Sequence, residues 1–130
     1  MPGRAIVVED DDILRNVITE ALALLGFRST EFSSADEALV FLANNEPVSL
    51  VVTDVHMPGV HDGLELAQHV WKTLPALPVI IISGKAVIPD NHLSRNSMFL
   101  RKPFSVDALH HAVTVLMQGQ HGSSDNQPYP

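Results

Sequence analysis

The sequence contains no cysteine among its 130 residues. A disulfide scaffold and a metal site built on thiolates are therefore excluded. Basic residues are also scarce, because 8 Lys and Arg stand against 15 Asp and Glu and leave a formal net charge of −7. Such sparse, scattered positive charge argues against broad contact with nucleic acid or with an anionic lipid surface. We therefore expect neither a direct nucleic-acid partner nor a membrane partner.

Long apolar runs are missing as well. No stretch is long enough to span a membrane, and the opening residues are not followed by the pattern of a signal peptide. We infer a cytoplasmic protein. The sequence does have an apolar fraction of 45%, which suffices for a buried core, and a length that suits one domain.

Short apolar runs alternate along the chain with segments whose apolar residues recur at helical spacing. The runs predict strands at 5–8, 27–32, 50–53, 79–82 and 98–100. Helices are expected after the first, second, third and fifth of these, at about 13–25, 34–43, 64–74 and 105–116. Repeated strand–helix units require a parallel sheet with helices on both faces. The fold class is therefore α/β, with five strands in one doubly wound sheet.

The central run, 50–53, stops abruptly at Asp54, and a Pro-Gly turn follows. A β-branched run of this kind suits a strand buried on both faces of a parallel sheet. The acid then lies at the carboxyl end of the strand, where open α/β sheets place their ligands. Taken alone, a strand-terminal Asp is more often a turn residue.

Polar side chains also follow three of the other strands. Glu9 and Asp10 come after the first, Ser83 after the fourth and Lys102 after the fifth. Carboxyl ends of parallel strands share one edge, so we expect these residues to converge with Asp54. Three carboxylates repel one another, and a hard cation such as Mg²⁺ resolves that conflict by taking their oxygens as ligands. Together with a hydroxyl and an ammonium group, they suit transfer of a phosphoryl group onto an aspartate.

Each motif also has a plainer interpretation. The acids at 9–12 are typical of a solvated helix start, and we interpret Asp11 and Asp12 as helix-cap charges. Ser83-Gly84 resembles an ordinary turn, and Lys102-Pro103 an ordinary strand exit. The coincidence of these features at matching strand ends favours the phosphoryl-transfer interpretation.

The chain from about Ala5 to Leu116 resembles the receiver domain of bacterial two-component response regulators. The motifs that carry the resemblance are Val7-Val8-Glu9-Asp10-Asp11, Asp54-Val55-His56-Met57-Pro58-Gly59, Ser83-Gly84 and Lys102-Pro103-Phe104. The resemblance implies a flavodoxin-like fold with strand order 2-1-3-4-5. We therefore expect a receiver domain over 1–117, followed by a polar and disordered tail over 118–130.

The resemblance also implies a role for each matching residue. Asp54 would be the phosphoacceptor. Mg²⁺ would be held by Glu9, Asp10, Asp54 and the backbone carbonyl of His56. The hydroxyl of Ser83 would turn toward the phosphoryl group.

Two further roles concern the last strand and its exit. Lys102 would act on the phosphoryl group, through a strand exit whose Lys102–Pro103 peptide bond is cis. Phe99 would be the aromatic residue that, with Ser83, switches conformation on activation.

A receiver of this kind is a signalling domain rather than an enzyme, although it promotes its own phosphotransfer and dephosphorylation. The implied donor is a histidine kinase or a histidine phosphotransfer protein, and the implied target is a protein. The chain would then be a stand-alone regulator or a relay domain of a hybrid histidine kinase. The oligomeric state, including a homodimer, stays open.

Two alternatives belong to other functional classes. One is a binding module that works without phosphorylation. The other is a Mg²⁺-dependent phosphatase, which is disfavoured because its general acid normally stands two residues after the nucleophile, where this chain has His56. A cap-sized insertion is also missing from the sequence.

The chain departs from the common family pattern at two places. The turn at 57–63 is one residue longer, and the stretch from Ser83 to Lys102 is a few residues shorter. The shorter stretch and Pro89 predict a shortened or irregular fourth helix between Lys85 and Asn96, which puts the usual dimer mode in doubt. His56 should overhang the acyl phosphate, where it would position or obstruct the attacking water.

Overall fold

The computed structural model describes residues 3–44, 46–57, 59–60, 62–84 and 96–121, with side chains up to residue 118. Five parallel strands form one sheet in the order β2-β1-β3-β4-β5. The strands are β1 (Gly3–Val8), β2 (Phe27–Phe32), β3 (Leu50–Asp54), β4 (Val79–Ser83) and β5 (Ser97–Arg101). The helices are α1 (Asp12–Ala23), α2 (Ala35–Ala43), α3 (Gly63–Thr73) and α4 (Val106–His121). This architecture confirms the predicted α/β class and strand order.

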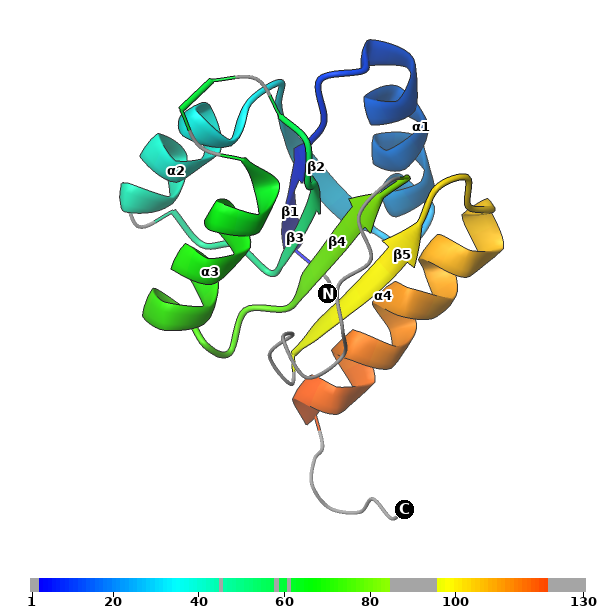
Figure 1. The fold of residues 1–130 in the computed structure, drawn as a ribbon. Helices are drawn as coiled ribbons and strands as arrows, with labels where there is room; N and C mark the ends of the chain where they lie inside the picture. The colour runs from blue at the N-terminus through cyan, green and yellow to red at the C-terminus, as the bar shows by residue number, and fades with distance from the viewer. Residues whose placement is uncertain (1–2, 45, 58, 61, 85–95, 122–130) are drawn as a thin grey trace.

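The helices cover the sheet in two pairs, with α1 and α4 on one face and α2 and α3 on the other (Figure 1). Alternate residues of each strand point into the two apolar layers on either side of the sheet. In β1, Val7 packs in the layer under α1 and α4, and Ile6 packs in the layer under α2 and α3. All residues of β3 and β4 are buried, which explains their uninterrupted apolar sequence. Burial of each such aliphatic side chain contributes about 1.5–3 kcal/mol to the free energy of folding.

The helix starts are fixed by short polar side chains. The Asp11 carboxylate accepts hydrogen bonds from two backbone N–H groups of α1, as predicted. Ser34 and Ser105 accept from the first turns of α2 and α4. Asp62 and Glu65 form a reciprocal capping box at the start of α3, which was not predicted from the sequence. These caps set where each helix leaves the sheet edge.

Some boundaries differ from the predicted ones. The helix α1 ends at Ala23, and the apolar side chains of Ile13 and Leu24 at its two ends are 80% and 77% exposed. The helix α4 continues to His121, so the first residues of the predicted tail are helical. The irregular fourth helix predicted between Lys85 and Asn96 and the remainder of the tail lie outside the described residues. Within the described part of the chain, no helix has both the length and the apolar character that a membrane crossing requires.

Candidate functional site

The polar residues predicted to converge lie at the carboxyl edge of the sheet. The parallel register pairs Asp54 of β3 with Ile82 of β4, and Ser83 of β4 with Arg101 of β5. Glu9 follows β1, and its backbone N–H still donates to Phe32 of β2. The strand ends therefore bring residues from across the whole sequence to one place, as the alternation of strands and helices predicted.

Three carboxylates form the centre of this site. Glu9, Asp10 and Asp54 each offer an oxygen, and these oxygens all lie within 4.8 Å of one another. Glu9 and Asp54 are buried, whereas Asp10 is exposed. The cluster therefore combines two buried acids with a third acid that is exposed to solvent.

The ammonium group of Lys102, which follows β5, joins the cluster. Its Nζ donates to Asp54 Oδ2 at 3.1 Å and lies 3.3 Å from Glu9 Oε1. Burial alone lowers the pKa of Lys102, but the hydrogen bond and charge of Asp54, followed by the charge of Glu9, outweigh it and raise the pKa above its ordinary value. Lys102 therefore stays protonated, and positively charged, at neutral pH.

The Glu9 carboxylate is held by contacts at both of its oxygens. Its Oε2 accepts a hydrogen bond from the Asp11 N–H at 3.1 Å. Its Oε1 is buried and has the ion pair with Lys102, but no hydrogen bond of good geometry. Burial raises the pKa of Glu9 above its ordinary value of 4.5; the Asp11 N–H opposes the shift, and the charges of Asp54 and Lys102 act in opposite directions. A buried carboxylate oxygen whose partner is a single ammonium group keeps lone pairs with which it can ligate a cation.

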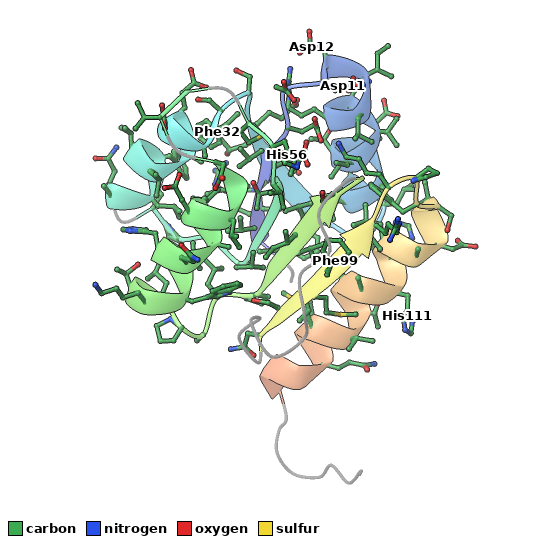
Figure 2. All side chains as sticks on the ribbon, viewed as in Figure 1. Asp11, Asp12, Phe32, His56, Phe99 and His111 are labelled. Carbon is green, nitrogen blue, oxygen red and sulfur yellow. The ribbon has the colours of Figure 1, made fainter. Side chains whose placement is uncertain are left out.

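The remaining predicted residues surround the cluster. Ser83 is fully buried at the end of β4, and its carbonyl accepts a hydrogen bond from the Lys102 N–H at 3.0 Å. The Lys102–Pro103 peptide bond is cis, as predicted. Phe99 lies on β5 opposite Ile81 and packs partly buried in the layer under α2 and α3 (Figure 2).

His56 lies in the loop that follows β3, with an exposed side chain (Figure 2). It is two residues beyond Asp54, and Val55 between them is buried and donates its N–H to Ile82. The backbone after Asp54 is thus anchored before the loop begins. The predicted use of the His56 carbonyl as a metal ligand stays a prediction.

Two residues that contact the site were not identified from the sequence. The guanidinium of Arg15 donates to the carbonyl oxygen of Glu9 at 2.7 Å. Gly63, the first residue of α3, lies against the backbone of Asp54 and donates its N–H to Val55. The available signals were an arginine near the start of an acid-rich helix, where a negative charge is normally favoured, and a glycine at a helix start.

Comparison with known proteins places these features in a family. The family model of the response regulator receiver domain matches residues 5–114. A curated relative, the response regulator receiver protein CpdR of Brucella abortus, is 36% identical over 104 residues, which cover 78% of this chain and 85% of that protein. Other curated relatives are transcriptional regulators of which the chain spans only 23% to 29%.

Solved structures agree with this match. A response regulator receiver protein from Sinorhizobium medicae superposes with a TM-score of 0.81 at 28% identity and covers 91% of this chain and 96% of its own. The response regulator TrrA of Thermotoga maritima, solved in complex with Mg²⁺-BeF, has a TM-score of 0.75 at 27% identity, with 88% and 98% coverage. The chain therefore belongs to the response regulator receiver domains of two-component systems.

Proposed function

We propose that this domain receives a phosphoryl group from a phosphohistidine onto Asp54 and signals the change to a protein partner. The observation that carries the proposal is the buried Asp54 carboxylate, held 3.1 Å from the Lys102 ammonium within a cluster of three acids. In the transfer, an Asp54 oxygen forms a bond to phosphorus while the bond from phosphorus to the donor imidazole nitrogen breaks. The electron pair of the broken bond stays with the imidazole, and an acyl phosphate results.

The donor set of the site fits Mg²⁺. Glu9, Asp10 and Asp54 would hold it through carboxylate oxygens, and the backbone carbonyl of His56 would complete the protein ligands. A bound Mg²⁺ supplies positive charge that offsets the phosphoryl oxygens. The buried Oε1 of Glu9, which has an ion pair with Lys102 but no hydrogen bond of good geometry, supports this assignment independently of the family, and TrrA, a relative of the same family, was solved in complex with Mg²⁺-BeF.

Lys102 has two tasks in this proposal. Before transfer its ammonium holds Asp54 in place and reduces the repulsion between Asp54 and Glu9. After transfer the new phosphoryl oxygens lie within its reach, and the same charge offsets theirs. The buried hydroxyl of Ser83, at the end of the neighbouring strand, would donate a hydrogen bond to the same oxygens.

The signal would pass from Ser83 to the surface at β5. Movement of the Ser83 hydroxyl toward the phosphoryl group would change the space along β4 and β5, where Phe99 is only partly buried. A change in the Phe99 rotamer would then alter the surface offered to a protein target. The upstream partner would be a histidine kinase or a histidine phosphotransfer protein, in a stand-alone regulator or in a relay.

Intact mass spectrometry after incubation with acetyl phosphate tests the proposal. We expect one added phosphoryl group per chain in the wild type, dependent on Mg²⁺, and none in Asp54→Ala. A folded wild type that shows neither a phosphoryl adduct nor a beryllofluoride complex in the presence of Mg²⁺ would contradict the proposal and favour a phosphorylation-independent binding module. Sustained turnover of phosphomonoesters, beyond one phosphoryl group per chain, would instead favour a phosphatase.

A further inference from the structure

A single guanidinium connects three elements around the metal-ligand pair. Arg15, in the first turns of α1, donates from Nη1 to the Glu9 carbonyl at 2.7 Å and from Nη2 to Asp12 Oδ1 at 2.6 Å. Its Nε donates to Glu31 Oε1 on β2 at 3.1 Å. The side chain is only 17% exposed. Arg15 therefore ties the end of β1 to the start of α1 and to the edge strand β2.

The contact between Arg15 and the Glu9 carbonyl lies where the backbone has to turn so that Glu9 and Asp10 can face the same site. Successive side chains of a strand point to opposite faces of the sheet. Glu9 and Asp10 are adjacent, yet both carboxylates lie within 4.8 Å of the Asp54 oxygen. The backbone therefore has to leave the strand conformation at Glu9, which takes the Glu9 carbonyl out of the sheet ladder. Arg15 supplies that carbonyl with a charged hydrogen-bond donor.

The other polar groups of Glu9 are already fixed. Its N–H donates to the Phe32 carbonyl at 3.0 Å, and its Oε2 accepts from the Asp11 N–H. With the Arg15 contact, the peptide group on each side of Glu9 has a fixed partner. The direction of the next residue, Asp10, follows from this constraint, because Asp10 is exposed and depends on its backbone for its position.

We propose that Arg15 is a positioning residue for the metal ligands Glu9 and Asp10. It holds the turn between them so that their carboxylates converge with Asp54, and it touches neither the metal nor the phosphoryl group. This inference rests on the proposed Mg²⁺ site. Residues that orient metal ligands from behind typically contribute about 10- to 100-fold in metal affinity.

Calorimetric titration of the full chain with Mg²⁺ tests this role. Arg15→Met keeps an unbranched apolar stem and removes all three donors, so we expect a Kd raised by about tenfold. Arg15→Lys keeps the positive charge but loses the planar guanidinium and its three donor atoms. Its Mg²⁺ Kd should therefore lie between those of Arg15→Met and the wild type. Glu31→Gln is the matched control, because it weakens the contact of Arg15 with Glu31 on β2 and leaves the contact with Glu9 in place. The Mg²⁺ Kd of this variant should stay within about twofold of the wild type.

Thermal unfolding of each variant without Mg²⁺ separates positioning from simple destabilisation. A purely structural role would lower the unfolding temperature of Arg15→Met and leave the Mg²⁺ Kd of the folded protein unchanged, which would overturn the inference. If Arg15→Met fails to fold, a wild-type Kd in Arg15→Lys would overturn it equally. A wild type that binds no Mg²⁺ would contradict the proposed function itself, so the two failures are distinguishable.

Discussion

Gly63 lies directly against the backbone of Asp54. A Cβ atom placed on Gly63 would be 1.6 Å from the Asp54 carbonyl oxygen and 2.8 Å from the Thr53 hydroxyl oxygen. The neighbouring atoms are backbone and a buried side chain, so they cannot move aside at little cost. The start of α3 can therefore approach the end of β3 this closely only because residue 63 has no side chain.

We expect Gly63→Ala to displace α3 and, with it, the phosphoacceptor strand end. Overpacking of this kind typically costs about 1–3 kcal/mol, and the cost should be at the upper end because the clash is with backbone. Urea unfolding measures the stability, and the rate of phosphoryl adduct formation with acetyl phosphate measures the effect on Asp54.

Gly84→Ala is the matched control for this glycine. Its Cβ would meet the Lys102 Cβ at 3.5 Å, an ordinary van der Waals contact beside the same site. Both stability and phosphorylation should stay close to those of the wild type. Equal behaviour of the two alanine variants would show that the approach of α3 to Asp54 does not depend on residue 63.

The raised pKa of Glu9 predicts a specific dependence of stability on pH. Between 4.5 and the higher pKa of the folded state, the native protein binds more protons than the unfolded chain. The free energy of unfolding of the Mg²⁺-free wild type should therefore fall as pH rises through this window and level off above it. Because Gln carries no titrating proton, Glu9→Gln should remove this component.

Urea unfolding in EDTA, from pH 4 to pH 8, checks the prediction. Relative to the wild type, Glu9→Gln should gain stability across the window as the pH rises. Added Mg²⁺ should then stabilise the wild type more than Glu9→Gln, since the metal binds the charged carboxylate. A stability difference between the two proteins that does not vary with pH would contradict the shift of the Glu9 pKa.

Much of the site could be predicted from the sequence, because parallel strands place their carboxyl ends on one edge. Asp54 and Lys102 meet for that reason alone, and the strong apolar runs before them made the strands easy to recognise. The contacts of Arg15 and Gly63 could not be predicted in the same way. They depend on how closely particular backbone segments approach, which periodicity does not encode.

The capping box of Asp62 and Glu65 is a different case, because its signal was present in the sequence as an acid three residues before a glutamate.

The helix α1 also shows which features the sequence predicts and which depend on the packing. Its apolar spacing predicted the helix, but it also included Ile13, which is 80% exposed. The buried positions are Ile18, Ala21 and Leu22. Hydrophobic spacing identifies a helix and its general apolar side, whereas the width of the covered stripe depends on where α4 and the sheet lie.

Lys102 should affect metal binding and phosphorylation in opposite directions. Its ammonium shares the oxygens of Asp54 and Glu9 that Mg²⁺ would use. Removing this charge in Lys102→Met should tighten Mg²⁺ binding by roughly three- to tenfold, a modest effect because the lysine is partly exposed to solvent. The same change should slow phosphoryl adduct formation by about tenfold or more, since a charge that stabilises the transferred group is lost.

Calorimetry and intact mass spectrometry measure these two effects on the same samples. Lys102→Arg, which keeps the positive charge, should leave the Mg²⁺ Kd close to that of the wild type. A Lys102→Met variant with weaker Mg²⁺ binding would show that the lysine supports the metal site instead of competing with it.

His56 is expected to act as a cover over the acyl phosphate. Its exposed imidazole lies two residues beyond Asp54, in the loop that follows β3. We expect a ring in this position to obstruct the approach of water to phosphorus, so His56→Ala should shorten the lifetime of the phosphorylated protein. The decay of the phosphoryl adduct, followed by intact mass after removal of acetyl phosphate, measures this lifetime.

Val60→Ala serves as the control for His56, because Val60 is 82% exposed in the same loop. It should leave the lifetime unchanged. A longer lifetime in His56→Ala would instead assign the ring to positioning the water. Equal lifetimes would make the side chain a spectator, and the water would then reach phosphorus from a direction that the loop after β3 does not control.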